Sequence, residues 1–233
     1  FFLYYTSLLT HGPHEETPDP KHPGKRLPKG FDSNVDYLDV VVGRLIDRLK
    51  DEGLDKNTIL IFIGDNGTAG HGKGTATELG AHVPFIAWGP GWIHPHPKAV
   101  GALSDVTDIF PTLAEFAEAP LPKDILFDGR SLVPLLTGKT DSHRDWIYSH
   151  LDDGRVLRDS RWLLELRGGD KPARFYDCGE DRMGADYRLL QGELSSEASE
   201  ARKRFESILA TMPEPKKTEV DDQPERKKKN ADE

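Results

Sequence analysis

Two neighbouring polar residues end an apolar run and could bind a divalent cation. The run Ile59–Ile63 is followed by Gly64, Asp65 and Asn66. In open α/β sheets, ligands bind beyond the carboxyl ends of the strands. Carboxylate and amide oxygens are the ligands that calcium and magnesium prefer. Asp65 and Asn66 are therefore candidate metal ligands, although Asn66-Gly67 is also a common turn pair.

A lysine follows shortly after these residues, within Gly72-Lys73-Gly74-Thr75. The flanking glycines allow the backbone to approach an anion closely. Lys73 is therefore a candidate ligand for an oxyanion, and the alternative is a solvated loop lysine.

His11 follows residues 1–6, an apolar and aromatic run that predicts a buried strand. A histidine at the carboxyl end of a strand would point to the same sheet edge as Asp65. It could donate a hydrogen bond to an anion when protonated, or transfer a proton near neutral pH. A surface position is the alternative. His14 follows the same run and is a candidate for the same reason. His71 and His82 flank the lysine segment and are weaker candidates, and His94 and His96 are expected in a surface loop.

The sequence offers no activated nucleophile. Cys178 lies in Asp177-Cys178-Gly179-Glu180, where acidic neighbours raise a thiol pKa, so we interpret it as structural. The glycine-containing segments match neither a P-loop nor a dinucleotide-binding fingerprint. A Gly-x-Ser-x-Gly elbow is also missing from the sequence.

The elements around these residues indicate an α/β fold. Residues 10–32 are predicted to be a long loop, and a helix is expected from Ser33 or Asn34, as its cap, to Gly53. Apolar runs at 58–63, 83–88 and 100–103 predict strands, and Asp105 caps a further helix that contains Pro111. This order favours βαβ units in a mostly parallel sheet flanked by helices.

The pattern changes near residue 140. Short apolar runs separated by turn residues predict a small antiparallel sheet, followed by a helix at about 194–210. Residues 213–233 contain almost no apolar side chains, so we expect them to be disordered. The expected organisation is an α/β part at 1–140, a small α+β subdomain at 141–212 and a charged tail at 213–233.

Composition limits the partners. The chain of 233 residues has a net charge of −9, which argues against general nucleic-acid binding. One cysteine cannot form an intrachain disulfide, and no apolar run approaches the length of a membrane span. The chain starts with an apolar strand and has neither an initiator Met nor a leader, so we expect it to be part of a longer polypeptide.

The ordered series of motifs resembles the sulfatase family of the alkaline-phosphatase superfamily over about residues 1–210. No single motif decides the resemblance, but the series in this order is highly specific. The matching segments are Phe1-Phe2-Leu3-Tyr4-Tyr5, Thr10-His11-Gly12-Pro13, Tyr37-Leu38 to Leu49-Lys50, Glu52-Gly53-Leu54, Asn57-Thr58-Ile59, Gly64-Asp65-Asn66-Gly67, Gly72-Lys73-Gly74-Thr75, Val83-Pro84-Phe85-Ile86, Asp105-Val106, Asp108-Ile109-Phe110-Pro111-Thr112-Leu113, Asp128-Gly129-Arg130-Ser131-Leu132, Arg161-Trp162 and Phe175-Tyr176-Asp177.

The resemblance implies a partial alkaline-phosphatase-like fold and a role for each candidate residue. Asp65 and Asn66 match the second pair of calcium ligands, with Mg²⁺ as an alternative ion. Lys73 matches the lysine that contacts the sulfate and the leaving oxygen, and His11 matches a histidine that hydrogen-bonds the sulfate. The implied substrate is a sulfated small molecule or glycan, and the implied location is periplasmic or secreted.

The chain departs from the family pattern in its missing first half. The Cys/Ser-x-Pro-x-Arg motif that yields the formylglycine nucleophile is missing, as are the first Asp-Asp metal pair and a second lysine–histidine pair. Cys178 is no substitute, because the Pro and Arg pair does not follow it at the required spacing. The Asn66–Lys73 loop is short for the family, and Leu79 and His82 replace its usual Gly and Arg.

Three functions remain open at this point. The first is part of a calcium-dependent sulfatase that hydrolyses a sulfate ester of a sugar or aryl alcohol, inactive as this chain alone. The second is a phosphodiesterase or phosphonate-ester hydrolase of the same superfamily. The third is a non-catalytic binding or structural module. The sequence leaves the oligomeric state open.

Overall fold

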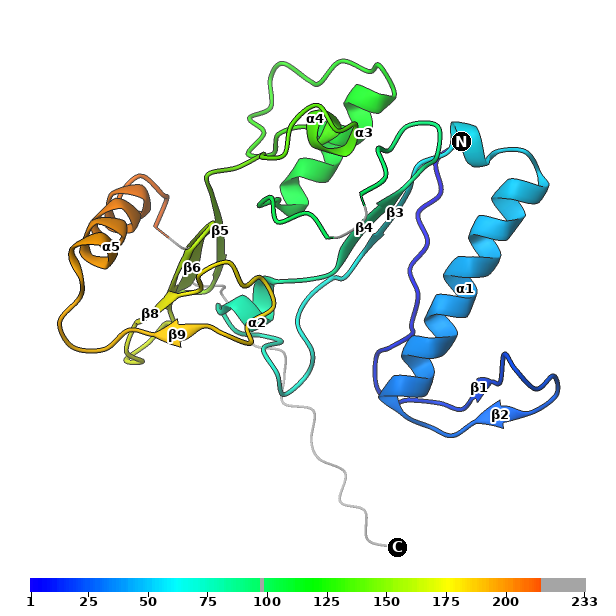
Figure 1. Cartoon of the computed structure of the whole chain (residues 1–233), viewed down its shortest axis with the longest axis horizontal. Coiled ribbons are helices and arrows are strands. Elements are labelled where there is room, and N and C mark those ends of the chain that lie inside the picture. The colour runs from blue at the N-terminus through cyan, green and yellow to red at the C-terminus, as the bar shows by residue number, and fades with distance from the viewer. Residues whose placement is uncertain (97–98, 215–233) are drawn as a thin grey trace, which may run out of the picture. The chain divides into compact units, whose positions relative to one another are not determined.

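The computed structural model describes residues 1–96 and 99–214, and its contacts divide the chain into two units (Figure 1). The first unit comprises Phe1–Leu60 and Ala87–Ile93, and the second comprises Ile61–Ile86 and the residues from His94 onwards. Apart from its first two residues, the tail predicted to be disordered lies outside the described residues. Among the described residues, no helix is long and apolar enough to cross a membrane.

The first unit is built around helix α1 (Phe31–Asp51). The predicted cap is wrong, because Gly30 holds the N-cap position and the Ser33 hydroxyl, inside the helix, donates to the carbonyl of Pro28 at 2.6 Å. Gly53 ends the helix as predicted, with a φ of 66° that favours glycine. A short 3₁₀ turn, η1 (Asp55–Asn57), follows.

The segment predicted as one long loop contains a small hairpin. Strands β1 (Thr17–Pro18) and β2 (Arg26–Leu27) pair antiparallel. Thr17 is buried, and its hydroxyl donates to the carbonyl of Ser33 at 3.3 Å, which ties the hairpin to α1.

The predicted buried strand at residues 1–6 is not formed. Phe1 and Tyr4 are 85% and 81% exposed, and no strand is assigned before β1. A strand needs a neighbour to accept and donate its backbone hydrogen bonds, and the described residues provide none for this segment.

Strands β3 (Leu60–Ile63) and β4 (Phe85–Trp88) form a two-stranded sheet, and each strand is divided between the two units. Gly64 N, after β3, donates to the carbonyl of Pro84, before β4, at 3.0 Å. Gly89, after β4, lies against the carbonyl of Thr58, before β3. The end of one strand therefore lies beside the start of the other, which is an antiparallel arrangement.

The mostly parallel sheet expected from the sequence is thus not seen in the described residues. A parallel pair needs a crossover that carries the chain back along the sheet, usually through a long helix. The connection between β3 and β4 contains only the single-turn helix α2 (Glu78–Ala81).

Asp105 caps the next helical segment as predicted. Its carboxylate accepts from Thr107 N at 2.9 Å, at the start of the 3₁₀ turn η2 (Val106–Asp108), which leads into α3 (Ile109–Phe116). Asp108 is fully buried and receives a bidentate contact from the guanidinium of Arg144.

The strand expected at 100–103 is reduced to one isolated bridge between Leu103 and Arg144. A one-turn helix, α4 (Val133–Leu136), was not predicted.

The antiparallel sheet predicted after residue 140 is confirmed. It has five strands in sequence order: β5 (Trp146–Leu151), β6 (Gly154–Asp159), β7 (Trp162–Leu166), β8 (Arg174–Asp177) and β9 (Arg188–Leu189). Helix α5 (Ser196–Leu209) follows, and the Ser195 hydroxyl caps it by accepting from Ala198 N at 3.2 Å.

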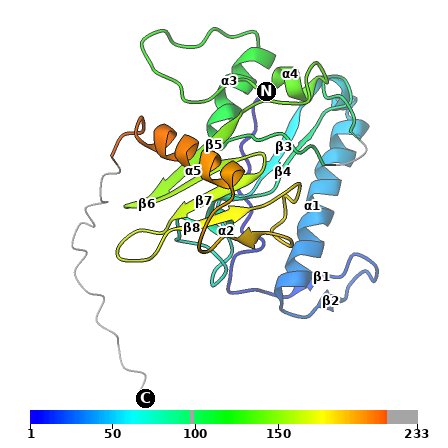
Figure 2. The same cartoon turned by 60° about the vertical axis from the view of Figure 1, so that its left-hand side comes forward.

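Each face of this sheet carries its own buried cluster. Figure 2 shows α5 lying across the sheet, and its Ala201 and Phe205 pack there against Leu157, Leu164 and Phe175. The opposite face buries a second cluster made of Val156, Leu163 and Cys178, against which Ala76 packs. Because successive residues of a strand point to opposite faces, the continuous apolar runs of β6 and β7 serve both clusters.

Candidate functional site

The carboxylate of Asp65 and the amide of Asn66 lie side by side immediately after β3. Asn66 Nδ2 donates to Asp65 Oδ2, and both residues are exposed. Gly64 fits here because a Cβ would lie 2.9 Å from the ring of Pro84. The strand thus ends by presenting two oxygen-bearing side chains to solvent.

Lys73 follows on a tight turn of the same unit. Its backbone N–H donates to the carbonyl of Thr68 at 3.2 Å, and Thr75 closes the turn by donating to the carbonyl of Gly72. Gly72 and Gly74, on either side of Lys73, have φ values of 125° and 75°. Only glycine adopts this backbone without strain, which explains the Gly-Lys-Gly spacing. The side chain of Lys73 is exposed.

A cavity of about 300 Å³ lies next to the Lys73 turn, and Gly74 is the first of its lining residues along the chain. Two hairpin connections of the five-stranded sheet form its other walls. The lining residues are mostly polar or charged: Gly74, Thr75, Ala76, Leu151, Asp152, Asp153, Arg167, Gly168, Gly169, Asp170 and Lys171. Asp153 joins the two connections, because its Oδ2 accepts from Gly169 N at 2.9 Å. The cavity is therefore bounded mainly by polar and charged groups close to the Lys73 turn.

His11 belongs to the other unit. Its side chain is exposed, and its Nδ1 lies 2.6 Å from the carbonyl oxygen of Gly12. Asp65, Asn66 and Lys73 lie together in one unit, whereas the convergence of His11 with them stays a prediction.

The other histidines considered from the sequence have local contacts. His14 Nε2 lies 3.1 Å from the carbonyl oxygen of Thr10, and His82 Nδ1 lies 3.5 Å from Glu78 Oε1. The rings of His94 and His96 lie 5.2 Å apart, edge to face.

Cys178 is structural in character, as predicted. Its side chain is 1% exposed, and burial raises the pKa of the thiol to about 11. Burial therefore contributes more than the acidic neighbours that the sequence suggested. Arg182 does stand four residues after Cys178, but Glu180 occupies the position of the required proline. A buried thiol with a raised pKa is a poor nucleophile.

The donor set fits part of a hard-cation site. Asp65 and Asn66 together offer carboxylate and amide oxygens, which suit calcium, but calcium takes six to eight oxygen ligands. Within the described residues, no group of three or more His, Cys, Asp or Glu side chains could hold a metal ion. Asp65 and Asn66 could therefore supply two ligands of a site, with the others from elsewhere.

The family model for sulfatases matches residues 1–119, which is just over half of the chain. This chain belongs to the sulfatase family. The sulfatase match spans α1, β3 and the segment that carries Asp65, Asn66 and Lys73.

Curated sulfatases extend the similarity beyond residue 119. Arylsulfatase A of Bos taurus is 35% identical over 194 residues, covering 77% of this chain and 36% of the relative. N-acetylgalactosamine-6-O-sulfatase of Bacteroides thetaiotaomicron is 30% identical over 244 residues, covering 92% of this chain and 46% of the relative. The chain thus spans between a third and a half of the length of these relatives.

Solved structures share the fold of this sulfatase chain. A Bacteroides thetaiotaomicron sulfatase structure, from work on glycosaminoglycan metabolism, matches with a TM-score of 0.62 at 24% identity, covering 77% of this chain and 44% of that chain. A phosphonate monoester hydrolase from Silicibacter pomeroyi matches with a TM-score of 0.59 at 25% identity, covering 77% of this chain and 39% of that chain. Over about three quarters of its length, the chain therefore shares its fold with sulfatases and a related hydrolase of the alkaline-phosphatase-like fold.

Sequence reasoning missed the buried polar residues behind the lysine turn. Arg158 and Glu165 are 3% and 5% exposed within strands β6 and β7. The available signal was a charged residue inside an apolar strand run, Arg158 in Arg155–Asp159 and Glu165 in Trp162–Leu166. Buried charges in such runs need partners, and both have them in α2.

Proposed function

We propose that this chain supplies part of the active site of a sulfatase that hydrolyses sulfate esters of sugars or aryl alcohols. The observation that carries the proposal is the placement of Asp65, Asn66 and Lys73 at the end of β3 and on the following glycine turn, within one unit. Family membership supports the same reaction class.

Each residue has a chemical role in this proposal. The carboxylate of Asp65 and the amide oxygen of Asn66 would hold Ca²⁺, with Mg²⁺ as the alternative. When bound, the cation offsets negative charge on the sulfuryl oxygens. Lys73 donates hydrogen bonds to the sulfate and to the leaving oxygen, where negative charge develops. His11 donates a hydrogen bond to the sulfate in its protonated form.

The nucleophile must come from outside these residues. The formylglycine of the family requires a Cys/Ser-x-Pro-x-Arg motif, and this chain has none. We therefore expect the chain alone to bind calcium weakly and to turn over no aryl sulfate. The sequence encoded upstream of Phe1 is expected to contain that motif.

The cavity beside Lys73 favours a sugar over an aryl alcohol. Its lining contains no aromatic side chain, and Leu151 is its largest apolar residue. Charged and glycine-rich loops offer hydrogen bonds to hydroxyl groups, whereas aryl groups are held by apolar and aromatic side chains. The relative named N-acetylgalactosamine-6-O-sulfatase points in the same direction.

The second candidate is a phosphonate or phosphodiester hydrolase of the same superfamily. The structural similarity to a phosphonate monoester hydrolase supports it, and a cation with a lysine would serve either oxyanion. The larger number of sulfatase relatives favours the sulfate ester.

The test measures kcat/KM of the complete polypeptide that contains this chain, with sulfate, phosphate and phosphonate esters of the same alcohol. We expect the highest value for the sulfate ester, and a loss of activity in Lys73→Ala that is absent in Lys139→Ala, an exposed control lysine. A higher kcat/KM for the phosphonate ester would favour the second candidate. Activity on none of the esters would favour a non-catalytic module.

A further inference from the structure

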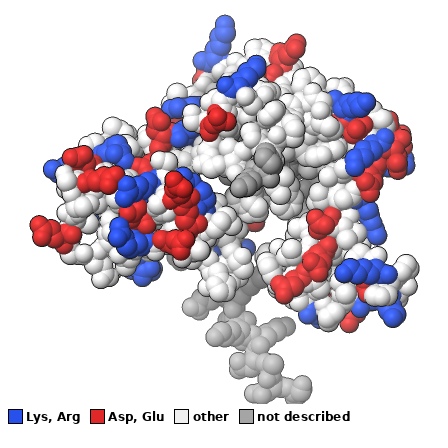
Figure 3. Space-filling model, viewed as in Figure 1, with Lys and Arg blue, Asp and Glu red and all other residues white. Residues whose placement is uncertain are grey.

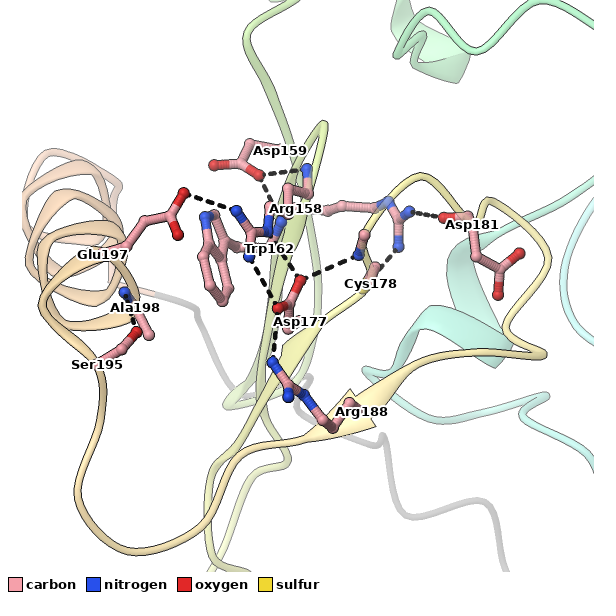
Figure 4. Close-up of polar contacts among 12 residues, drawn as sticks. Arg158, Asp159, Trp162, Asp177, Cys178, Asp181, Arg188, Ser195, Glu197 and Ala198 are labelled. Carbon is pink, nitrogen blue, oxygen red and sulfur yellow. Dashed lines mark hydrogen bonds and ion pairs between the residues drawn. The ribbon is translucent and has the colours of Figure 1, made fainter.

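The face of the five-stranded sheet opposite α5 is partly charged and receives the segment that follows Lys73. Val156 and Leu163 on this face pack against Ala76. The strand register pairs Val156 with Glu165, and Arg158 with Leu163, so both charged residues lie on the same face as the apolar pair. Figure 4 shows Arg158 directed away from α5, toward Asp181.

Both charged residues bind helix α2. Glu165 Oε1 accepts from the backbone N–H of Glu78 at 2.9 Å, which satisfies a free donor at the start of the helix. Arg158 Nη1 donates to Glu78 Oε1 at 3.0 Å, and the Tyr187 hydroxyl donates to the same oxygen at 3.0 Å. One short helix is thus held by contacts from three strands or loops that lie about 80 or more residues further along the chain.

Helix α2 in turn contacts the turn that carries Lys73. A Cβ at Gly72 would lie 2.4 Å from the carbonyl of Leu79, and a Cβ at Gly67 would lie 2.0 Å from the same oxygen. Gly67 N also donates to the carbonyl of Gly80 at 3.2 Å. Backbone therefore packs directly on backbone, so a shift of α2 must shift the turn at Lys73.

The burial of charged side chains in this cluster points to a positioning role. Burial raises the pKa of the Glu165 carboxyl, so its ionised form is disfavoured in the folded protein. Buried ion pairs often contribute no more stability than apolar residues of the same size would. What such a cluster does provide is one defined geometry for the groups it binds.

We infer that Glu78, Arg158 and Glu165 are positioning residues that fix Lys73 through α2, so that the C-terminal sheet sets the geometry of the anion site. This inference rests on the proposed function for its consequence in catalysis. The contact path itself, from the sheet to α2 and on to Gly72, stands on the contacts described above.

The test uses two variants that keep the core filled. The first, Glu165→Leu, removes the acceptor for Glu78 N–H, whereas Glu165→Gln retains one. The second is the double variant Glu78→Met/Arg158→Met, which replaces the ion pair with apolar groups and is expected to fold. Arg188→Met is the control, because Arg188 pairs with Asp177 on the same sheet away from α2.

The first readout is amide hydrogen exchange. In Glu165→Leu and in the double variant, we expect the amides of Lys73 and Thr75 to lose about tenfold or more in protection, with those of β6 and β7 unchanged. Glu165→Gln should restore protection, and Arg188→Met should have no effect. Unchanged protection at Lys73 and Thr75 in both variants would overturn the inference, as would an equal loss throughout the sheet.

The second readout is binding of inorganic sulfate, in the presence of calcium, to the complete polypeptide that contains this chain. We expect the same two variants to bind sulfate more weakly, and Glu165→Gln to bind like the parent protein. If the parent protein binds no sulfate, the proposed function fails while the exchange experiment still tests the contact path. Sulfate affinity that is unchanged despite a loosened turn would overturn the positioning role.

Discussion

The five-stranded sheet and the Asp65–Lys73 segment belong to one unit, but different kinds of contact stabilise each of them. Leu157, Leu163 and Leu164 in the sheet are each 1% exposed. The segment instead exposes its candidate site residues and is ordered by turns, glycine contacts and α2. Under the proposed function, stability resides in the sheet and chemistry in the segment, so mutations should separate the two. On the face seen in Figure 3, acidic and basic side chains are intermingled.

The largest effect on stability should come from the core under α5. Phe205 is fully buried and meets the ring of Phe175 edge to face, with centroids 6.2 Å apart. Phe205→Ala should lower the free energy of unfolding by about 3–5 kcal/mol, measured by urea denaturation. Leu126→Ala, at a side chain that is 92% exposed, is the control and should cost less than about 0.5 kcal/mol. Equal effects of the two variants would contradict the comparison.

A somewhat smaller effect is expected at the buried carboxylate of Asp108. Arg144→Met leaves this carboxylate without its bidentate partner, so it should cost about 3 kcal/mol in the same assay. Arg48→Met, at an exposed pair with Glu52 on α1, should cost less than about 1 kcal/mol. If Arg144→Met were as mild as Arg48→Met, Asp108 would not be a structural centre of its unit.

The pH dependence of the sheet should depend on Asp177. The Arg161 guanidinium beside it lowers the pKa of this carboxyl from 3.8 to about 2. The stabilisation, about 2 kcal/mol, is therefore present above pH 3.8 and is lost as the pH falls toward 2. Asp177→Asn should flatten the acid side of the stability curve measured by urea denaturation. A curve of unchanged slope in that variant would show that other carboxyls carry the acid sensitivity.

The smallest effect on stability should come from the site itself. Lys73→Ala and Asp65→Asn remove exposed side chains, so each should change the free energy of unfolding by less than about 0.5 kcal/mol. Calcium-dependent sulfate binding, measured by calorimetry, should nevertheless be lost or strongly weakened. Asp36→Asn, at an exposed acid on α1, should change neither quantity. A large loss of stability in Asp65→Asn would contradict the separation of chemistry from stability.

The sequence predicted local elements well where periodicity was strong. The helix ending at Gly53, the cap at Asp105, the strands after residue 140 and helix α5 all appear. It failed where pairing partners decide the outcome. The apolar residues 1–6 are exposed, and β3 and β4 are not joined by a parallel crossover.

The candidate site was predictable in part. Asp65, Asn66 and Lys73 could be proposed from the sequence because oxygen ligands after a strand and glycines around a lysine have local signatures. Arg158 and Glu165 were missed because their partner, Glu78, is about 80 residues away, and strand register rather than sequence spacing brings them together.

The central claim is that the residues at Asp65, Asn66, Lys73 and His11 bind one cation and one oxyanion. The most direct measurement is an NMR titration of the complete, isotope-labelled polypeptide that contains this chain, with calcium and inorganic sulfate. We predict that, with calcium present, the signals of all four residues shift as sulfate is added. The four shifts should give the same dissociation constant for sulfate. Shifts at Asp65 and Asn66 with calcium, but none at Lys73 or His11 with sulfate, would contradict the claim.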